Sequence, residues 1–136
     1  MGFDIKCSDL KEDEIQFCQQ AIKTYNRLMT VILDGDMYRL VSPYEGNHAS
    51  TMMVSGDKSK AVVFAFDINP RYSEHLLPVK LQGLDPDRQY RVTEVNRMGG
   101  WPLSCDGKTY SGEYLMTVGL NLFGTGKLTS HVLELD

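Results

Sequence analysis

The sequence predicts a mainly β fold, an antiparallel β-sandwich of seven to eight strands preceded by one long N-terminal α-helix. Two observations support this prediction. Apolar residues recur at helical spacing from about Asp9 to Leu33, and the pattern stops at Gly35. Beyond Gly35, short β-like runs alternate with turn signals and leave little room for the helices that connect parallel strands. We therefore expect two parts, 1–34 with the long helix and 35–136 with the β-sandwich.

The predicted helix has a defined beginning and end. Asp9 forms a possible capping box with Glu12, with Ser8 as the rival cap, and Gly35 suits the left-handed position after a helix. Two apolar stripes lie side by side on the helix: Ile15, Cys18, Ile22, Tyr25, Met29 and Ile32 in one, and Leu10, Phe17, Ala21 and Leu28 in the other. They cover an arc of roughly 160°, wider than the ordinary amphipathic face of about 100°. We therefore expect the helix to pack against the sandwich and a second body, and to form a homo-oligomer through residues 10–32 when that body is missing.

Seven runs after Gly35 have the character of strands: 37–41, 49–55, 61–66, 78–82, 89–95, 114–120 and 130–135. The second, third, sixth and seventh runs are very apolar, which predicts that they are the central strands. A turn at Asp85-Pro86-Asp87 precedes the fifth run, because proline presets φ and an aspartate can bond the backbone two residues on. Tyr90, Val92 and Val95 alternate with polar residues there, as in a half-buried strand.

The composition is that of an ordinary globular domain and argues against several kinds of partner. At 136 residues the chain is about one domain. The net charge is −4 and the 14 basic residues are scattered, which argues against nucleic acid and anionic membranes. No run approaches the length of a transmembrane helix. The 3 cysteines at unrelated spacings indicate reduced thiols, which favours the cytoplasm, although any signal peptide would lie outside a chain cut from a longer protein.

The sequence predicts no catalytic residue, no metal site and no cofactor. The 3 histidines (His48, His75 and His131) lie outside any nucleophile motif, even though Ser50 and Ser130 are close to two of them. We interpret these histidines as solvated residues in loops and at strand ends. The cysteines lack metal-ligand spacing. Each candidate carboxylate for glycoside hydrolysis has a sufficient structural explanation; the candidates are Asp34 with Asp36, Asp85 with Asp87, and Asp67.

Aromatic residues offer a second candidate function, a surface that stacks on a sugar ring. Trp101 lies in a Gly-Gly-Trp-Pro loop, where its ring could be exposed, and Tyr110 or Tyr72 could add a second ring. The alternative for Trp101 is an anchor tucked over the edge of the sandwich. Trp101 and Tyr110 are therefore the candidate sugar contacts.

Five segments, taken in order, resemble the C-terminal region of the α-galactosidases (melibiases) of glycoside hydrolase family 36. They are GDMYRLVSPYEGN (35–47), VVFAFDINPRY (62–72), LQGLDPDRQYRVTEVN (81–96), SGEYLMTVGL (111–120) and LTSHVLEL (128–135). In that family a (β/α)8 barrel hydrolyses terminal α-galactosides such as melibiose and raffinose with retention, and an antiparallel β-sandwich follows it. The resemblance implies that the predicted helix is the last barrel helix and that the sandwich begins at Asp36.

The resemblance also implies that this chain is not the catalytic part. The family's nucleophilic aspartate lies in a Lys-Trp-Asp-type motif, and the only tryptophan here is Trp101, in a different context. Retention needs that carboxylate and a second one as acid and base. We therefore expect a non-catalytic domain that covers and supports the barrel of a parent enzyme. The alternative is a galactoside-binding module that uses exposed aromatic rings near Trp101.

Overall fold

The structure, a computed structural model, describes residues 6–71, 76–124 and 128–136. A short 3-10 helix (Cys7–Asp9) and the long helix α1 (Glu12–Asp34) open the chain. The elements that follow are β1 (Asp36–Val41), β2 (His48–Val54), β3 (Ala61–Asp67), β4 (Gln89–Glu94), β5 (Thr109–Ser111), α2 (Gly112–Thr117) and β6 (Thr129–Leu135). The predicted long helix and the mainly β, antiparallel character are confirmed, with six strands in the described part of the chain rather than seven to eight.

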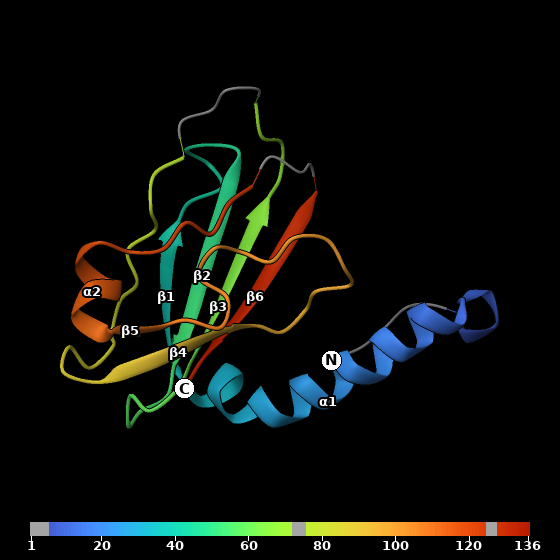
Figure 1. Cartoon of the computed structure of the whole chain (residues 1–136), viewed down its shortest axis with the longest axis horizontal. Helices are drawn as coiled ribbons and strands as arrows, with labels where there is room; N and C mark the ends of the chain where they lie inside the picture. The colour runs from blue at the N-terminus through green and yellow to red at the C-terminus, as the bar shows by residue number, and fades with distance from the viewer. Residues whose placement is uncertain (1–5, 72–75, 125–127) are drawn as a thin grey trace.

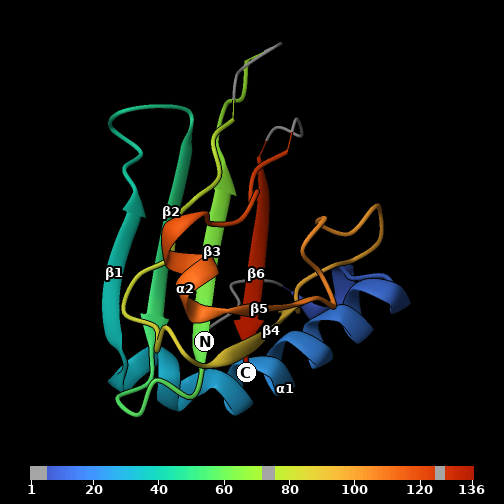
Figure 2. The same cartoon turned by 60° about the vertical axis from the view of Figure 1, so that its left-hand side comes forward.

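The strands form one antiparallel sheet in the order β1-β2-β3-β6-β4-β5. The centre is regular: β2 pairs with β3 from His48↔Asp67 to Val54↔Ala61, and β3 pairs with β6 along its whole length. β4 and β5 run across the ends of the central strands at a steep angle (Figures 1 and 2). The last strand of the chain thus lies between β3 and β4, and closes the sheet through contacts that are distant in sequence.

Each face of the sheet is covered by a different layer. One face carries the main core, which includes Met52, Val63, Tyr90 and Leu133, all fully buried. This face is covered by α2 and by irregular segments that contribute residues such as Leu81 and Leu122. The other face carries Val62 with the partly buried Phe64 and Val132, and α1 packs on it (Figure 2). Because side chains alternate between the faces of a strand, one set of strands supplies both cores.

Two predicted strands have a different structure. The segment 114–120 lies largely in α2, which begins after Ser111, whose Oγ accepts a hydrogen bond from the Tyr114 backbone N–H at 3.1 Å. The segment 78–82 contributes only an isolated antiparallel bridge, Val79↔Leu120. Each segment contributes buried residues to the main core, such as Leu81 and Leu115, but Tyr114 and Val118 are 40% and 48% exposed. The predicted strand conformation is therefore wrong for both segments.

The ends of α1 also differ from the prediction. The helix begins at Glu12 after Lys11, whose backbone N–H donates to the Glu14 carboxylate at 2.8 Å, so neither Asp9 nor Ser8 is the cap. At the other end, Gly35 has an extended backbone with φ −77° and is not left-handed. Glycine is needed there for space, because a Cβ would overlap the Val31 carbonyl oxygen and lie 2.7 Å from that of Val54.

Only the C-terminal half of α1 packs on the sheet. Its buried residues are Thr24, Leu28 and Val31, and Arg27 pairs with the buried Glu134 of β6. The N-terminal half extends past the sheet (Figure 1). Ile22 and Met29, from the first predicted stripe, remain 43% and 41% exposed. The prediction that the sheet covers only part of the apolar surface is therefore confirmed for the described residues.

The turn before β4 is as predicted. The Asp87 backbone N–H donates to Asp85 Oδ1 at 3.1 Å, and Tyr90 and Val92 are fully buried in the main core. Val95 instead packs on the α1 side, since it lies an odd number of residues from Val92.

Candidate functional site

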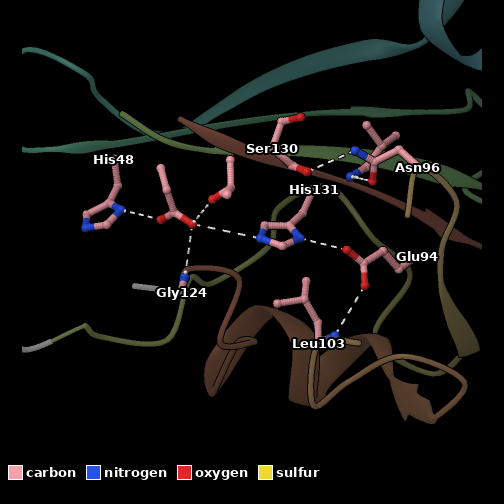
Figure 3. Close-up of polar contacts among 10 residues, drawn as sticks. His48, Glu94, Asn96, Leu103, Gly124, Ser130 and His131 are labelled. Carbon is pink, nitrogen blue, oxygen red and sulfur yellow. Dashed lines mark hydrogen bonds and ion pairs between the residues drawn. The ribbon is translucent and has the colours of Figure 1, made fainter. Parts of the chain in front are cut away.

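Four titratable residues from four strands form a buried polar network beside the main core (Figure 3). They are His48 of β2, Asp67 of β3, Glu94 of β4 and His131 of β6, and we call them the His–carboxylate network. The side chains of Asp67 and Glu94 are 0% and 4% exposed, and those of His48 and His131 are 8% and 19% exposed. The register explains the first contact, because His48 and Asp67 are direct partners in the β2–β3 pair.

Asp67 is the centre of the network. Its Oδ1 lies 2.8 Å from His48 Nδ1, and its Oδ2 accepts from the Thr129 hydroxyl at 2.8 Å and from the Gly124 backbone N–H at 3.1 Å. An ionised carboxylate is only an acceptor, so His48 Nδ1 carries a hydrogen in this arrangement. Hydrogen-bond donors stabilise a buried carboxylate. Through these contacts Asp67 of β3 links β2, β6 and the segment before β6.

His131 lies between the two carboxylates. Its Nδ1 is 2.7 Å from Glu94 Oε1, and its Nε2 is 3.8 Å from Asp67 Oδ2, which is an electrostatic contact rather than a hydrogen bond. Glu94 Oε2 accepts from the Leu103 backbone N–H at 3.2 Å. The loop that follows β4 is thereby fixed to the sheet (Figure 3).

This geometry indicates a structural role for the network rather than acid–base catalysis. Both carboxylates are buried, so neither can reach a glycosidic bond in solvent. Ser50, one of the two serines close to a histidine in sequence, donates its hydroxyl to the Phe64 carbonyl oxygen at 2.9 Å. The interpretation of His48 and His131 as solvated residues is therefore wrong. Ser50, Met52 and Val54 alternate on the buried side of β2, and the same alternation extended to His48 would have placed it inside.

The described residues contain neither a cluster fit for a metal ion nor a helix fit to span a membrane. No group of three or more His, Cys, Asp or Glu side chains there is arranged to hold a metal ion. No described helix is both long and apolar enough to cross a membrane. Cys18 and Cys105 are free thiols, and burial raises the pKa of Cys105 to about 11. Because the thiolate is the reactive form of cysteine, this raised pKa makes Cys105 a structural thiol of low reactivity.

A cleft of about 500 Å³ adjoins the network. His48 lines it together with the β1–β2 connection, which includes Ser42 and Glu45, and with the segment that contains Lys80 and Gln82. The His48 ring also contacts the Phe123 ring, with centroids 4.6 Å apart. The cleft is therefore lined by both polar and apolar residues, and the hydrogen bond to Asp67 holds the His48 side chain in its wall.

The two predicted sugar contacts lie in different settings. Trp101 is 97% exposed, which excludes an anchoring contact and leaves its ring open to solvent. Tyr110 is partly buried and stacks on Tyr114 of α2 at 5.2 Å, and desolvation by burial raises the pKa of its hydroxyl. Tyr72 and His75 lie outside the described residues. The loop after β4 extends toward the α1 side, whereas β5 leads to α2 in the opposite direction (Figures 1 and 2).

Comparison with known proteins places these features in a family. The model of the glycosyl hydrolase family 36 C-terminal domain matches residues 48–135. The chain is 31% identical over 135 residues to probable alpha-galactosidase G of Aspergillus terreus, an alignment that covers 99% of this chain and 17% of that protein. It is 35% identical over 136 residues to alpha-galactosidase C of Emericella nidulans, covering 99% of this chain and 16% of that protein.

Solved structures agree with this assignment. The crystal structure of alpha-galactosidase AgaB from Geobacillus stearothermophilus matches with a TM-score of 0.79 and 31% identity, covering 96% of this chain and 16% of that one. A variant of AgaA from the same organism, in complex with 1-deoxygalactonojirimycin, matches with a TM-score of 0.82 and 29% identity, covering 99% and 17%. The chain thus spans 16–17% of the length of these four proteins. Since both its sequence and its fold match along nearly the whole chain, it belongs to the family of C-terminal domains of glycosyl hydrolase family 36.

Proposed function

We propose that this chain is the non-catalytic closing domain of an α-galactosidase, in which it covers and supports a catalytic barrel. The parent enzyme would hydrolyse terminal α-galactosides of the melibiose and raffinose type with retention. The observation that carries the proposal is the match to a small terminal part of much longer α-galactosidases. Structures of AgaA, one such relative, include complexes with raffinose and stachyose.

The surface of α1 supports a barrel as the partner. Leu33 is 65% exposed, and Ile22 and Met29 are more than 40% exposed, on a helix whose opposite side packs on the sheet. Burial of apolar area stabilises a contact by about 25 cal/mol per Å², so this surface favours a second packed layer. In the proposal, residues 1–34 are the N-terminal segment that contains α1, the last helix of the barrel, and residues 35–136 are the closing domain.

A chimera tests the proposal. The C-terminal domain of AgaA would be replaced by this chain, and hydrolysis of an aryl α-galactoside would be compared with that by AgaA without any such domain and by this chain alone. We expect the chimera to be soluble and active, the truncated AgaA to lose activity, and the chain alone to release no product. Ile22→Asp with Met29→Asp should lower the yield of active chimera, because both charges would enter the contact. Hydrolysis by the chain alone would refute a non-catalytic role.

The same surface supports self-association of the chain in isolation. Without a barrel, the apolar residues of the 10–32 segment are open to water and favour a homo-oligomer. Sedimentation equilibrium over a hundredfold concentration range should reveal a dimer, and the variant with Ile22→Asp and Met29→Asp should remain monomeric. If the unmodified chain were as strictly monomeric as the variant, this part of the proposal would be contradicted.

A second candidate function is galactoside binding through the loop after β4, favoured by the full exposure of Trp101. An exposed indole can stack on the apolar face of a galactose ring, and Tyr110 is proposed as the second contact. Titration with galactose, followed by the Trp101 fluorescence, would test this function. Trp101→Ala should abolish binding with no loss of stability, and Tyr110→Ala should weaken it. Unchanged fluorescence up to tens of millimolar galactose would rule it out.

A further inference from the structure

We propose that the cleft beside His48 is a binding site for a neutral oligosaccharide of two to three units. The cleft lies between the β1–β2 connection and the segment that contains Lys80, at the end of the sheet remote from α1 (Figure 1). A partner packed along α1 would therefore leave it open. Its volume of about 500 Å³ is within the range of 300–1,000 Å³ that is typical of small-molecule sites.

The polar groups of the cleft indicate a neutral ligand with many hydroxyl groups. Glu45 is an acceptor, Lys80 is a donor, and Ser42 and Gln82 can be both. The two opposite charges make the cleft formally neutral, so a free anion would face Glu45 and a free cation would face Lys80. A sugar hydroxyl donates and accepts at once, and a row of hydroxyl groups can therefore use both kinds of side chain without carrying a charge into the site.

The apolar wall fits the other surface of a sugar. Leu40, Val79 and Phe123 also line the cleft and offer contacts to the C–H face of a pyranose ring. The Tyr44 side chain is 97% exposed in the same β1–β2 connection that supplies Ser42 and Glu45. Its ring is available to stack on a sugar unit that extends beyond the cleft.

The wall of the cleft is held in place before any ligand arrives. His48 is 6% exposed, is bonded to Asp67 at 2.8 Å, and packs on the Phe123 ring at an interplanar angle of 34°. In the β1–β2 connection, the Glu45 backbone N–H donates to the Ser42 carbonyl oxygen at 3.3 Å. Such preorganisation lowers the ordering cost of binding.

An amide-resolved NMR titration of the complete chain tests the proposal, with raffinose and maltotriose as probes and inorganic phosphate and ammonium as charged comparisons. We expect saturable shifts in the amides of residues 40–48 and 79–82 with at least one sugar, and none of comparable size with either ion. Glu45→Met and Lys80→Met should each weaken sugar binding about fivefold or more, as for one lost hydrogen bond. Both side chains are exposed, so the fold should be unchanged.

Glu12→Met and Lys23→Met, at exposed positions of α1 outside the cleft, are the matched controls and should each change the dissociation constant less than twofold. Each of three results would overturn the proposal. The first is the absence of any saturable shift up to about 50 mM sugar, the concentration range of weak but specific binding. The other two are shifts confined to the loop after β4, and binding of phosphate or ammonium without binding of sugar. The experiment needs no barrel and no turnover, so its outcome is independent of the proposed role in an α-galactosidase.

Discussion

Replacing Asp67 by alanine should destabilise the chain by about 3–5 kcal/mol, because it removes a buried group that several hydrogen bonds share. Three donors lose their acceptor: His48 Nδ1, the Gly124 backbone N–H and the Thr129 hydroxyl. A hydrogen bond to a charged group contributes about 1.5–3 kcal/mol. Three bonds at the lower value give about 4.5 kcal/mol, from which the relief of no longer burying a charge must be subtracted. Domains of this size have about 5–15 kcal/mol in all.

Urea unfolding followed by far-UV circular dichroism is the appropriate assay. Tryptophan fluorescence would be a poor probe of unfolding, because Trp101 is already 97% exposed in the folded chain. With a slope of about 2 kcal/mol per M urea, a loss of about 4 kcal/mol lowers the midpoint by about 2 M. Asp67→Asn keeps one acceptor oxygen and should be intermediate. Asp87→Ala, which removes an exposed carboxylate, should change stability by less than about 0.5 kcal/mol.

The reasoning would be refuted if Asp67→Ala cost less than about 1 kcal/mol, the contribution of a single ordinary hydrogen bond. That result would mean that the three donors find other partners, so the His–carboxylate network would not hold the strands and the segment before β6 together. Equal losses for Asp67→Asn and Asp67→Ala would instead assign the effect to the charge alone, rather than to the number of acceptors.

Three other changes have definite expected outcomes. Gly83→Ala should cost about 2 kcal/mol or more, because φ is +74° and the new Cβ would lie 2.5 Å from the Tyr38 hydroxyl oxygen; adding Tyr38→Ala should recover only part of the midpoint in urea. Tyr90→Phe should cost about 2 kcal/mol by calorimetry, since the buried hydroxyl bonds two backbone groups, and a neutral effect would mean that water replaces it. Burial raises the pKa of the Cys105 thiol from 9.0 to about 11, so the folded chain keeps a proton that the unfolded chain loses. Its contribution to stability is therefore complete below about pH 9 and falls as the pH rises toward 11, and Cys105→Ala should flatten that part of a pH–stability curve.

The assignment to glycosyl hydrolase family 36 could be predicted from the sequence. Its five ordered segments led to the same C-terminal domain that the comparison with known proteins identifies over residues 48–135. The absence of a matching nucleophile motif led to a non-catalytic role, because a resemblance to a supporting domain transfers no catalytic residue. The candidate cleft was not predicted. Ser42, Glu45 and Lys80 are separated by up to 38 residues of sequence, and only the folded chain brings them to one cleft.

The sequence by itself determined the long helix, the turn before β4, and the strands β1, β2, β3, β4 and β6, because these depend on local periodicity and turn chemistry. Tertiary structure decided which apolar segments became strands. The segment 114–120 has strand-like residues, yet it became largely α2, since it lies on the sheet instead of in it. Tertiary structure also decided that His48 is buried and His131 partly buried, because their partners Asp67 and Glu94 come from neighbouring strands. Pairing across a sheet depends on contacts that no local pattern contains.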